Sequence, residues 1–368
     1  MSTNADGAGA SRSREVDPSF WRGRRVLLTG HTGFKGAWLA LWLQSLGANV
    51  TGFSLDVPTH PSLYELARVG EEMDNIDGDV RDASALVEAV QQSDAEVVIH
   101  MAAQSLVRRS FSEPRVTYET NVLGTVNLLD AVRFVGQRAR VVIVITSDKC
   151  YENREWEWGY REDEPMGGHD PYSSSKGCAE LVTSAYRRSF FSDPNGTRVA
   201  SARAGNVIGG GDWGEDRLVP DIMRATLARE EVLVRNPNSV RPWQHVLNPL
   251  SGYLVLAEAL WESPDDAAGW NFGPPEEDAQ TVGWLVEHLG ELWPDGVRWS
   301  VDDGPHPHEA RYLKLDSSRS RSRLGWRPLV PLHVALASVV DWYRELASDA
   351  DMRNVSLGQI QALQHAGV

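Results

Sequence analysis

Five residues near the middle of the chain carry side chains that can move protons. Ser147, Asp148 and Lys149 come after the apolar run 141–145 and Thr146, and Tyr172 and Lys176 come later. The run is short, continuous and rich in β-branched residues, which predicts a buried parallel strand. Polar groups at the carboxyl end of such a strand lie where open α/β sheets bind their ligands.

Tyr172 and Lys176 are spaced i,i+4, so on a helix they share one face. Pro171 in the first turn and Asp170 as an N-cap favour a helix that begins here. An ammonium beside a phenol favours the phenolate, so we expect a pKa below the reference value of about 10. With a serine hydroxyl on the same substrate oxygen, the pair can remove a proton from a sugar hydroxyl while a hydride leaves the carbon. Because the spacing is common by chance, this prediction needs a dinucleotide site beside it.

Such a site is predicted near the start of the chain. A buried strand over 24–29 runs into a glycine-rich turn and then into an apolar helix over 37–43. This order of elements is the context of dinucleotide binding. Gly30 permits the tight turn, Gly33 lets the backbone approach a pyrophosphate, and Gly36 allows close packing of helix on strand. The free N–H groups of the helix start then face the phosphates.

Asp56 ends the second predicted strand, where a carboxylate can accept both ribose hydroxyls of a dinucleotide. A carboxylate there repels a 2′-phosphate, and no arginine follows within 57–60, so the expected cofactor is NAD rather than NADP. Asn121 lies in a predicted long helix over 113–136, where it is either solvated or bonded to backbone near the site. The expected cofactor contacts are Gly30, Thr32, Gly33, Phe34, Lys35, Gly36, Asp56, Asp79, Val80, Ala102, Ala103, Asn121, Tyr172 and Lys176.

The sequence pattern changes after residue 204, where loops mix arginine, proline and tryptophan. Arginine binds pyrophosphate bidentately, and a tryptophan can stack on a base or sugar. Most arginines in proteins are solvated surface groups, so that interpretation stays open beside the functional one. The expected substrate contacts are Gln104, Asn206, Arg217, Leu218, Arg235, Arg241, Trp243, His245, His308 and Tyr312.

Composition restricts the possible partners. The 368 residues are 42% hydrophobic and 24% charged, which is typical of a globular chain of one large or two modest domains. The net charge of −15 disfavours nucleic-acid and anionic-membrane binding, and no apolar run reaches transmembrane length. The chain has only two cysteines, Cys150 and Cys178, which suggests a reducing compartment. We expect both to be buried thiols of the core rather than nucleophiles. Without a secretory signal in the first 17 residues or a metal-ligand cluster, we expect a cytoplasmic protein that holds no metal.

Taken together, these motifs resemble the extended short-chain dehydrogenase/reductase family. TGHTGFKG, Asp56, the segment 146–151 and YSSSK carry the resemblance, which covers about residues 20–345. Within that family the chain looks most like the CDP-glucose 4,6-dehydratases, because of the segments 146–151, 241–246 (RPWQHV) and 308–316.

The resemblance implies an α/β fold with a Rossmann, doubly wound and mostly parallel sheet of seven strands. It also implies a smaller C-terminal lobe that binds a sugar nucleotide, and a homodimer paired through the helices near 113–136 and 171–191. The expected divisions are a disordered tail over 1–19, a NAD-binding domain over 20–204, a mainly substrate-binding part over 205–348 that returns at intervals to the first domain, and a weakly ordered tail over 349–368.

The resemblance further implies a reaction. Tyr172 takes the C4 hydroxyl proton while NAD takes the C4 hydride, Ser147 bonds the same oxygen, and Lys176 holds the phenolate and the nicotinamide ribose. Protonated Asp148 donates to the departing C6 hydroxyl, water is lost across C5–C6, and the hydride returns to C6. CDP-glucose thereby becomes CDP-4-keto-6-deoxyglucose.

Lys149 stands where related dehydratases usually carry the glutamate that removes the C5 proton. An ammonium cannot accept a proton, so Lys149 either acts as the free amine or only stabilises the enolate. The sequence leaves both open.

Three other functions compete with this interpretation. A sugar-nucleotide C4 epimerase shares serine, tyrosine, lysine and NAD but lacks an elimination acid, so Asp148 beside Lys149 argues against it. A catalytically silent NAD-sensing protein would usually lose Tyr172 or Lys176, and both are present. Dehydration of another NDP-hexose stays open, because the nucleobase rests on the resemblance alone.

Overall fold

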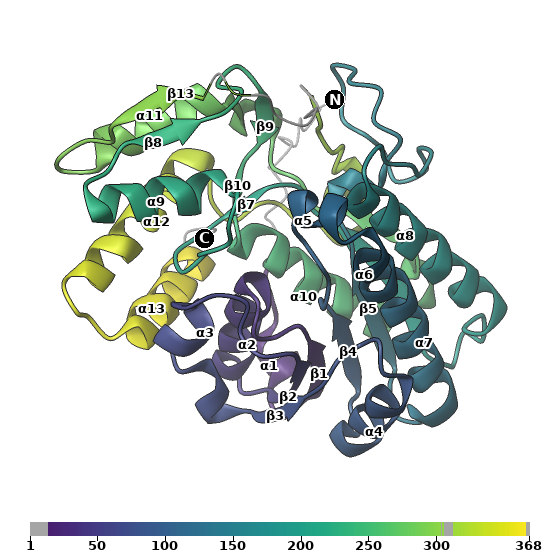
Figure 1. Cartoon of the computed structure of the whole chain (residues 1–368). Coiled ribbons are helices and arrows are strands. Elements are labelled where there is room, and N and C mark those ends of the chain that lie inside the picture. The colour runs from purple at the N-terminus through teal and green to yellow at the C-terminus, as the bar shows by residue number, and fades with distance from the viewer. Residues whose placement is uncertain (1–13, 303, 305–311, 366–368) are drawn as a thin grey trace, which may run out of the picture.

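A seven-stranded sheet forms the centre of the protein (Figure 1). The computed structural model describes residues 14–302, 304 and 312–365. Its sheet pairs in the order β11-β6-β5-β4-β1-β2-β3, with every pair parallel. The direction of strand order reverses between β1 and β4, which is the Rossmann arrangement, so the predicted fold class is confirmed. The strands are β1 (Arg25–Thr29), β2 (Asn49–Ser54), β3 (Asp74–Asp77), β4 (Val97–His100), β5 (Val141–Ile145), β6 (Arg198–Arg203) and β11 (Gly269–Asn271).

Helices cover both faces of this sheet. Val141 and Ile143 of β5 join the hydrophobic cluster on one face, while Val142 and Val144 join the cluster on the other. A strand buried on both faces can be apolar throughout, which explains the continuous run in the sequence. The first face is covered by α2 (Phe34–Ser45) and α10 (Leu247–Glu262), and the second by α4 (Ala83–Ser93) and α7 (Gly124–Val135), with α8 (Pro171–Ser189) beside α7.

The long helix predicted over 113–136 forms as one helical run with an irregularity in its middle. It consists of α6 (Pro114–Tyr118), a π-helical turn (Glu119–Leu123) and α7. Asn121 lies in the π-helical turn and is buried. Such turns are rare and occur frequently at functional sites.

Smaller elements gather at one side of the molecule (Figure 1). Three two-stranded sheets pair β7 (Val207–Ile208) with β10 (Gln244–His245), β8 (Val232–Val234) with β13 (Trp299–Val301), and β9 (Val240–Pro242) with β12 (Ala279–Thr281). The remaining α-helices of the described residues are α1 (Pro18–Trp21), α3 (Leu63–Leu66), α5 (Val107–Ser112), α9 (Leu218–Ala228), α11 (Val282–Leu292), α12 (Leu332–Ala347) and α13 (Met352–His365). Within the described ranges, no helix has the length and apolar character needed to cross a membrane.

The two predicted tails are corrected wherever the structure describes them. The segment 349–368 contains α13, whose Met352 and Ile360 are buried against the core, while Ser356 accepts a hydrogen bond from the indole of Trp342 at 3.0 Å. This buried stripe holds only two strongly apolar positions, so its helical periodicity is weak in the sequence. At the other end, Val16 is buried, and residues 1–13 lie outside the described ranges.

Replacement of Ile360 by alanine tests the docking of α13. We expect Ile360→Ala to lower the free energy of unfolding by about 2–4 kcal/mol, because it leaves a cavity in the core. The measurement is urea denaturation followed by circular dichroism. The control is Gln361→Ala at an exposed neighbouring position, where the change should stay within about 0.5 kcal/mol. Equal stabilities of the two variants would contradict the docking.

Candidate functional site

A cavity of about 1180 Å³ opens at the carboxyl ends of the central strands. It spans the point where the strand order reverses, between β1 and β4, which is where open α/β sheets bind ligands. Most predicted site residues line it. These are Gly30, Thr32, Gly33, Phe34, Lys35, Gly36, Asp56, Asp79, Val80, Ala102, Ala103, Gln104, Ser147, Asp148, Lys149, Tyr172, Lys176, Asn206, Arg217, Leu218, Arg235, Arg241 and Trp243.

Three predicted contacts lie elsewhere, and His308 is outside the described residues. His245 is fully buried, with its ring 6.1 Å from that of Trp38, and burial lowers its pKa to about 3. It sits on β10 and faces the core, so its prediction as a substrate contact is wrong. Tyr312 does not line the cavity, although the next residue, Leu313, does. Asn121 lies behind the cavity wall.

The glycine-rich turn has the conformation that the sequence predicts. Gly30 has φ +76°, and a Cβ there would lie 2.7 Å from the backbone nitrogen of Ala102. A Cβ on Gly36 would lie 2.1 Å from the carbonyl oxygen of Gly30. Gly33 is the N-cap of α2 and provides no side-chain cap, so the N–H groups of this helix start face the cavity. A pyrophosphate fits such a backbone cradle.

The ribose end of the cavity is acidic. The Thr32 hydroxyl is hydrogen-bonded to that of Ser54 at 2.8 Å and donates to the carbonyl of Leu55 at 3.0 Å, which joins the glycine-rich turn to the end of β2. Asp56 follows directly and lines the cavity. Asp79 lies beside it in the lining and accepts hydrogen bonds from Arg81, which lower its pKa. Carboxylates here favour a dinucleotide without a 2′-phosphate, as predicted for NAD.

The end of β5 places a buried acid in the cavity. The Ser147 hydroxyl donates to Asp148 Oδ1 at 2.9 Å and accepts from the backbone N–H of Lys149 at 3.2 Å. Asp148 is only 3% exposed, and burial raises its pKa despite the opposing charge of Lys149. Burial therefore shifts this carboxyl toward its neutral form, which is the form that can donate a proton.

Tyr172 and Lys176 share the buried face of α8, whose start is capped as predicted. The Asp170 carboxylate accepts the backbone N–H of Ser173 at 2.9 Å. Burial raises the pKa of Tyr172 to about 12, although contact with Ser147 acts in the opposite direction.

The expected lowering of the Tyr172 pKa by Lys176 is therefore wrong for this structure. The Lys176 ammonium donates to the carbonyl of Ile145 at 3.3 Å, and burial lowers its own pKa to about 8. Burial is the largest influence on the pKa of both side chains, and it disfavours the charged form of each.

Asn121 supports the site from behind. Its side-chain oxygen accepts the backbone N–H of Gln104 at 2.8 Å. Its amide donates to the carbonyl of Gln104 at 3.0 Å and to the Ser175 hydroxyl at 2.8 Å. Of the two interpretations left open by the sequence, the structure supports the bonded one, and the expected direct contact with the cofactor is wrong.

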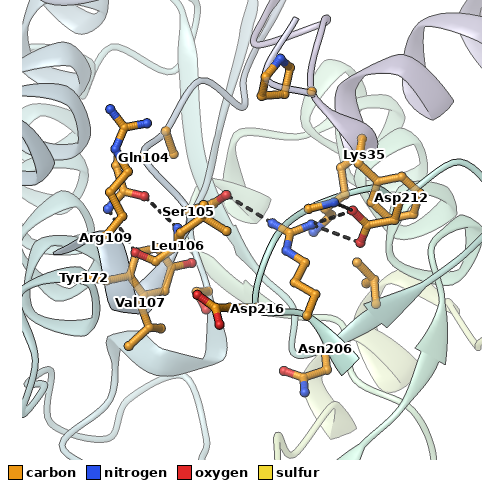
Figure 2. Close-up of a pocket in the computed structure, with 18 of the residues that line it drawn as sticks. Lys35, Gln104, Ser105, Leu106, Val107, Arg109, Tyr172, Asn206, Asp212 and Asp216 are labelled. Atoms are coloured by element: carbon orange, nitrogen blue, oxygen red, sulfur yellow. Dashed lines mark hydrogen bonds and ion pairs between the residues drawn. The ribbon is translucent and has the colours of Figure 1, made fainter. Parts of the chain in front are cut away.

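Acidic partners that the sequence analysis missed hold two of the predicted arginines. Arg217 pairs with Asp212 at 3.0 Å and donates to the Ser105 hydroxyl at 3.1 Å. It therefore joins two residues of the cavity lining, Ser105 and Asp212, which are both labelled in Figure 2. Arg235 lies 3.6 Å from Asp216. No short spacing links Ser105 to Arg217, so nothing in the sequence revealed this contact.

Cys150 is fully buried outside the cavity lining, and burial raises the pKa of its thiol well above the usual value. The core interpretation of this cysteine is therefore confirmed. Cys178 is partly buried and also lies outside the lining.

Comparisons with known proteins agree with this geometry. The sequence model of the family described as GDP-mannose 4,6 dehydratase matches residues 27–268. The chain belongs to this family. A curated relative of this dehydratase family, the CDP-glucose 4,6-dehydratase of Salmonella typhimurium, is 54% identical over 342 residues, which are 92% of this chain and 95% of that protein. The dTDP-glucose 4,6-dehydratase of Streptomyces griseus is 30% identical over 87% of this chain and 94% of that protein.

Solved structures of this dehydratase family share the fold. DesIV, a dTDP-glucose 4,6-dehydratase from Streptomyces venezuelae crystallised with NAD and TYD, has a TM-score of 0.74 at 26% identity and covers 89% of this chain and 99% of that one. A UDP-glucose 4-epimerase from Thermotoga maritima also has a TM-score of 0.74 at 21% identity, over 88% and 99% of the two chains, and shows the shared fold alone. Family and cavity together make the chain a NAD-dependent enzyme, as predicted.

Gly36→Ala tests the dinucleotide cradle. Because the added Cβ would lie 2.1 Å from the Gly30 carbonyl oxygen, the turn must shift, and we expect NAD to bind at least about tenfold more weakly. Isothermal titration calorimetry measures the affinity, and circular dichroism checks the fold. The control is Gly358→Ala, where a Cβ meets nothing within 4 Å. Unchanged NAD affinity in Gly36→Ala would contradict the placement of the pyrophosphate.

Proposed function

We propose that the chain is a NAD-dependent CDP-glucose 4,6-dehydratase that forms CDP-4-keto-6-deoxyglucose. The observation that carries the proposal is the pairing, in one cavity, of the buried acid Asp148 with the Tyr172–Lys176 pair and Ser147. A C4 epimerase needs the latter three but has no use for a protonated carboxyl at the sugar. The 54% identity to the Salmonella typhimurium enzyme supports CDP-glucose as the substrate.

Tyr172 and Ser147 perform the proton transfer at C4. The Tyr172 phenolate accepts the C4 hydroxyl proton, and the Ser147 hydroxyl donates a hydrogen bond to the same oxygen. Lys176, on the same face of α8, stabilises the phenolate and binds the nicotinamide ribose. When bound, NAD would supply the acceptor for the C4 hydride and the donor of the hydride that C6 receives.

Asp148 performs the elimination. The new C4 ketone acidifies the C5 proton, and the neutral Asp148 carboxyl protonates the departing C6 hydroxyl, so that water leaves across C5–C6. Burial favours this protonated form. A positioned acid of this kind contributes about 100- to 10,000-fold to the rate.

Lys149 is the base for the C5 proton in this proposal. It is the residue next to Asp148 and lines the same cavity, while the family's usual glutamate is absent from this position. Its side-chain nitrogen accepts the C5 proton, and the positive charge that results stabilises the enolate. A proton returns from the same nitrogen to C5 when hydride is added at C6.

Arg217, Arg235 and Arg241 bind the substrate pyrophosphate. All three line the cavity, and the first two are held in place by Asp212 and Asp216. Guanidinium groups fixed in this way bind phosphate oxygens bidentately with little further loss of side-chain entropy.

A homodimer through α7 and α8 completes the proposal. Four large apolar side chains on and beside these helices are 47–66% exposed. Because large exposed apolar patches are uncommon on monomers, these side chains favour an interface at this position. They are Leu123, Phe134, Leu181 and Phe190.

Transfer of a labelled hydride tests the proposed reaction. We expect C4-deuterated CDP-glucose to yield a 4-keto-6-deoxy product with deuterium at C6, detected by NMR. Incubation with CDP-, dTDP-, UDP- and GDP-glucose should show the highest kcat/KM for CDP-glucose. A galacto product would indicate a C4 epimerase instead. Turnover of another nucleotide sugar in preference to CDP-glucose would show that cytosine is not the preferred nucleobase. A product without deuterium at C6 would refute the mechanism.

Lys149→Met tests whether Lys149 removes the C5 proton. We expect exchange of the C5 proton with deuterated solvent to fall about 100- to 10,000-fold, because the variant has no group that accepts this proton. The control is Lys314→Met, which removes a lysine outside the cavity lining. Full exchange in Lys149→Met would show that Lys149 is not the base.

A further inference from the structure

A buried ion pair behind the catalytic site takes no part in the chemistry described above. Glu180 on α8 and Arg203 on β6 form two hydrogen bonds, at 2.7 and 2.8 Å, and each side chain is only 4% exposed. Burial of two charges is costly, so a pair of this kind is weak evidence for stability by itself. Its position points instead to a role at the site.

Glu180 also binds the strand end that carries the catalytic serine. The Thr146 hydroxyl donates to Glu180 Oε1 at 2.5 Å, and the Ser201 hydroxyl donates to Oε2 at 2.6 Å. Thr146 directly precedes Ser147. A single carboxylate therefore joins the end of β5 to α8.

The same helix carries the other half of the site. Tyr172, Lys176 and Glu180 follow one another at i,i+4 spacing and are all buried, so they share one face of α8. Glu180 thus lies one turn beyond the Lys176 ammonium. Through Thr146 and through α8 it contacts both elements that carry catalytic groups.

The Glu180 carboxylate opposes the effect of burial on Lys176. Burial lowers the pKa of Lys176 to about 8, and the negative charge of Glu180 is the main influence in the opposite direction. The other titratable or charged groups that face this part of the site come from neighbouring elements: Lys35 of α2, His100 of β4, Asp148 and Cys150 after β5, Tyr172 of α8 and Arg203 of β6.

Glu180 remains ionised although it is buried. Burial raises its pKa, but the charge and hydrogen bonds of Arg203, with those from Ser201 and Thr146, outweigh burial and leave the pKa below its ordinary value. The negative charge next to Lys176 is therefore a lasting feature of the site.

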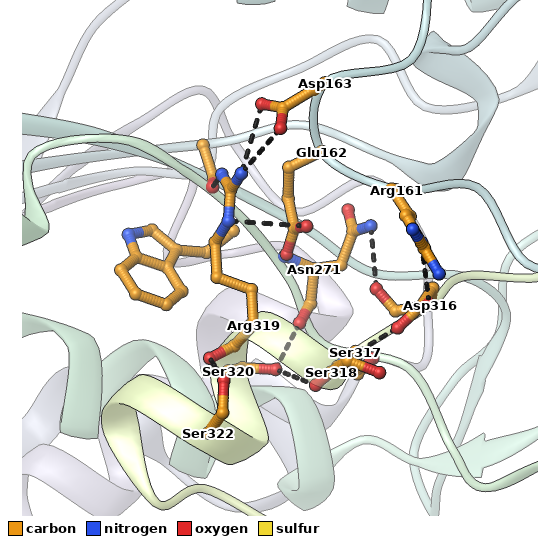
Figure 3. A network of polar contacts seen from close by, with 12 residues as sticks. Arg161, Glu162, Asp163, Asn271, Asp316, Ser317, Ser318, Arg319, Ser320 and Ser322 are labelled. Atoms are coloured by element: carbon orange, nitrogen blue, oxygen red, sulfur yellow. Dashed lines mark hydrogen bonds and ion pairs between the residues drawn. The ribbon is translucent and has the colours of Figure 1, made fainter.

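Arg203 is itself held from the side away from Glu180. It donates to the Tyr151 hydroxyl at 2.5 Å and to the carbonyl of Glu162 at 3.0 Å. Glu162 accepts the backbone N–H of Asn271 and lies 3.6 Å from Arg319, within the polar network of Figure 3. Glu162 thus connects the ion pair to β11 at the edge of the sheet.

We propose that Glu180 is a positioning residue for the dehydration, acting through Thr146 to hold Ser147 in place and through Lys176 to maintain the ammonium beside Tyr172. The inference rests on the proposed function. It assigns a task to a residue that touches neither the sugar nor the dinucleotide.

Glu180→Gln removes the charge and keeps the shape. The variant leaves Arg203 buried without a counter-charge, so both changes disfavour the Lys176 ammonium and lower its pKa. Because Lys176 acts as the protonated form, activity is present below its pKa and lost as the pH rises through it. The loss must therefore begin at a lower pH in the variant.

The experiment is a pH profile of kcat for the full chain saturated with NAD and CDP-glucose. We expect the alkaline limb to move to lower pH by about one unit or more in Glu180→Gln, since a nearby opposite charge shifts a pKa by about 1–3 units. KM for CDP-glucose should change less than about twofold, because the residue does not contact substrate.

Ser201→Ala is the matched control. It removes one hydrogen bond to the same carboxylate but no charge, so the midpoint of thermal unfolding can fall while the alkaline limb stays at its wild-type pH. If Glu180→Gln does not fold, the double variant Glu180→Gln/Arg203→Gln replaces the whole pair, which proteins tolerate better than one unpaired buried charge. Its limb should still lie at lower pH than that of the wild type.

The outcomes separate the two proposals. A lower kcat at every pH with an unmoved alkaline limb, in either Glu180 variant, would overturn the inference and leave Glu180 a structural residue. Restoration of the wild-type limb by Glu180→Asp, which keeps the charge, would support it. Failure of the wild-type protein to dehydrate any nucleotide sugar would overturn the proposed function, and the inference with it, before any variant is compared.

Discussion

Burial of ionisable groups is the constraint on which the site depends. Asp148, Tyr172 and Lys176 are each less than 10% exposed, and burial pushes each of them toward its neutral form. For Asp148 the neutral form suits an elimination acid. For Tyr172 and Lys176 it opposes the phenolate–ammonium pair that the oxidation needs, so other charges must compensate.

The fold places a charge that opposes the effect of burial on Lys176, the Glu180 carboxylate, behind the cavity. The carboxyl ends of parallel strands meet at one edge of the sheet, so β5 and β6 bring Thr146 and Arg203 to the same carboxylate on α8. The π-helical turn adds Asn121, which ties the Gln104 backbone to Ser175 of α8. Two buried polar side chains, Glu180 and Asn121, therefore hold α8 against the ends of β5 and β6 and against the segment that follows β4.

The arginines on the proposed substrate side of the cavity are less buried than the groups at the end of β5 and on α8. There the cations are partly accessible and are held by acidic partners on adjoining loops, as Arg217 is by Asp212. A strongly acidic chain thereby presents a locally basic surface to an anionic substrate. The net charge of −15 disfavours polyanionic partners without preventing the binding of one pyrophosphate.

Sequence by itself determined the fold class, the glycine-rich turn and the residues that we propose as the catalytic group. These follow from local physics: the φ of +76° at Gly30, the i,i+4 spacing of Tyr172 and Lys176, and the apolar run of β5 depend on residues close together in the chain. Only the tertiary structure decided which charged groups lie near those residues and shift their pKa values. The inward orientation of His245, the partners of Arg217 and the pair formed by Glu180 and Arg203 all depend on segments far apart in the sequence, because electrostatic energies are set by distance and burial in space rather than by spacing along the chain.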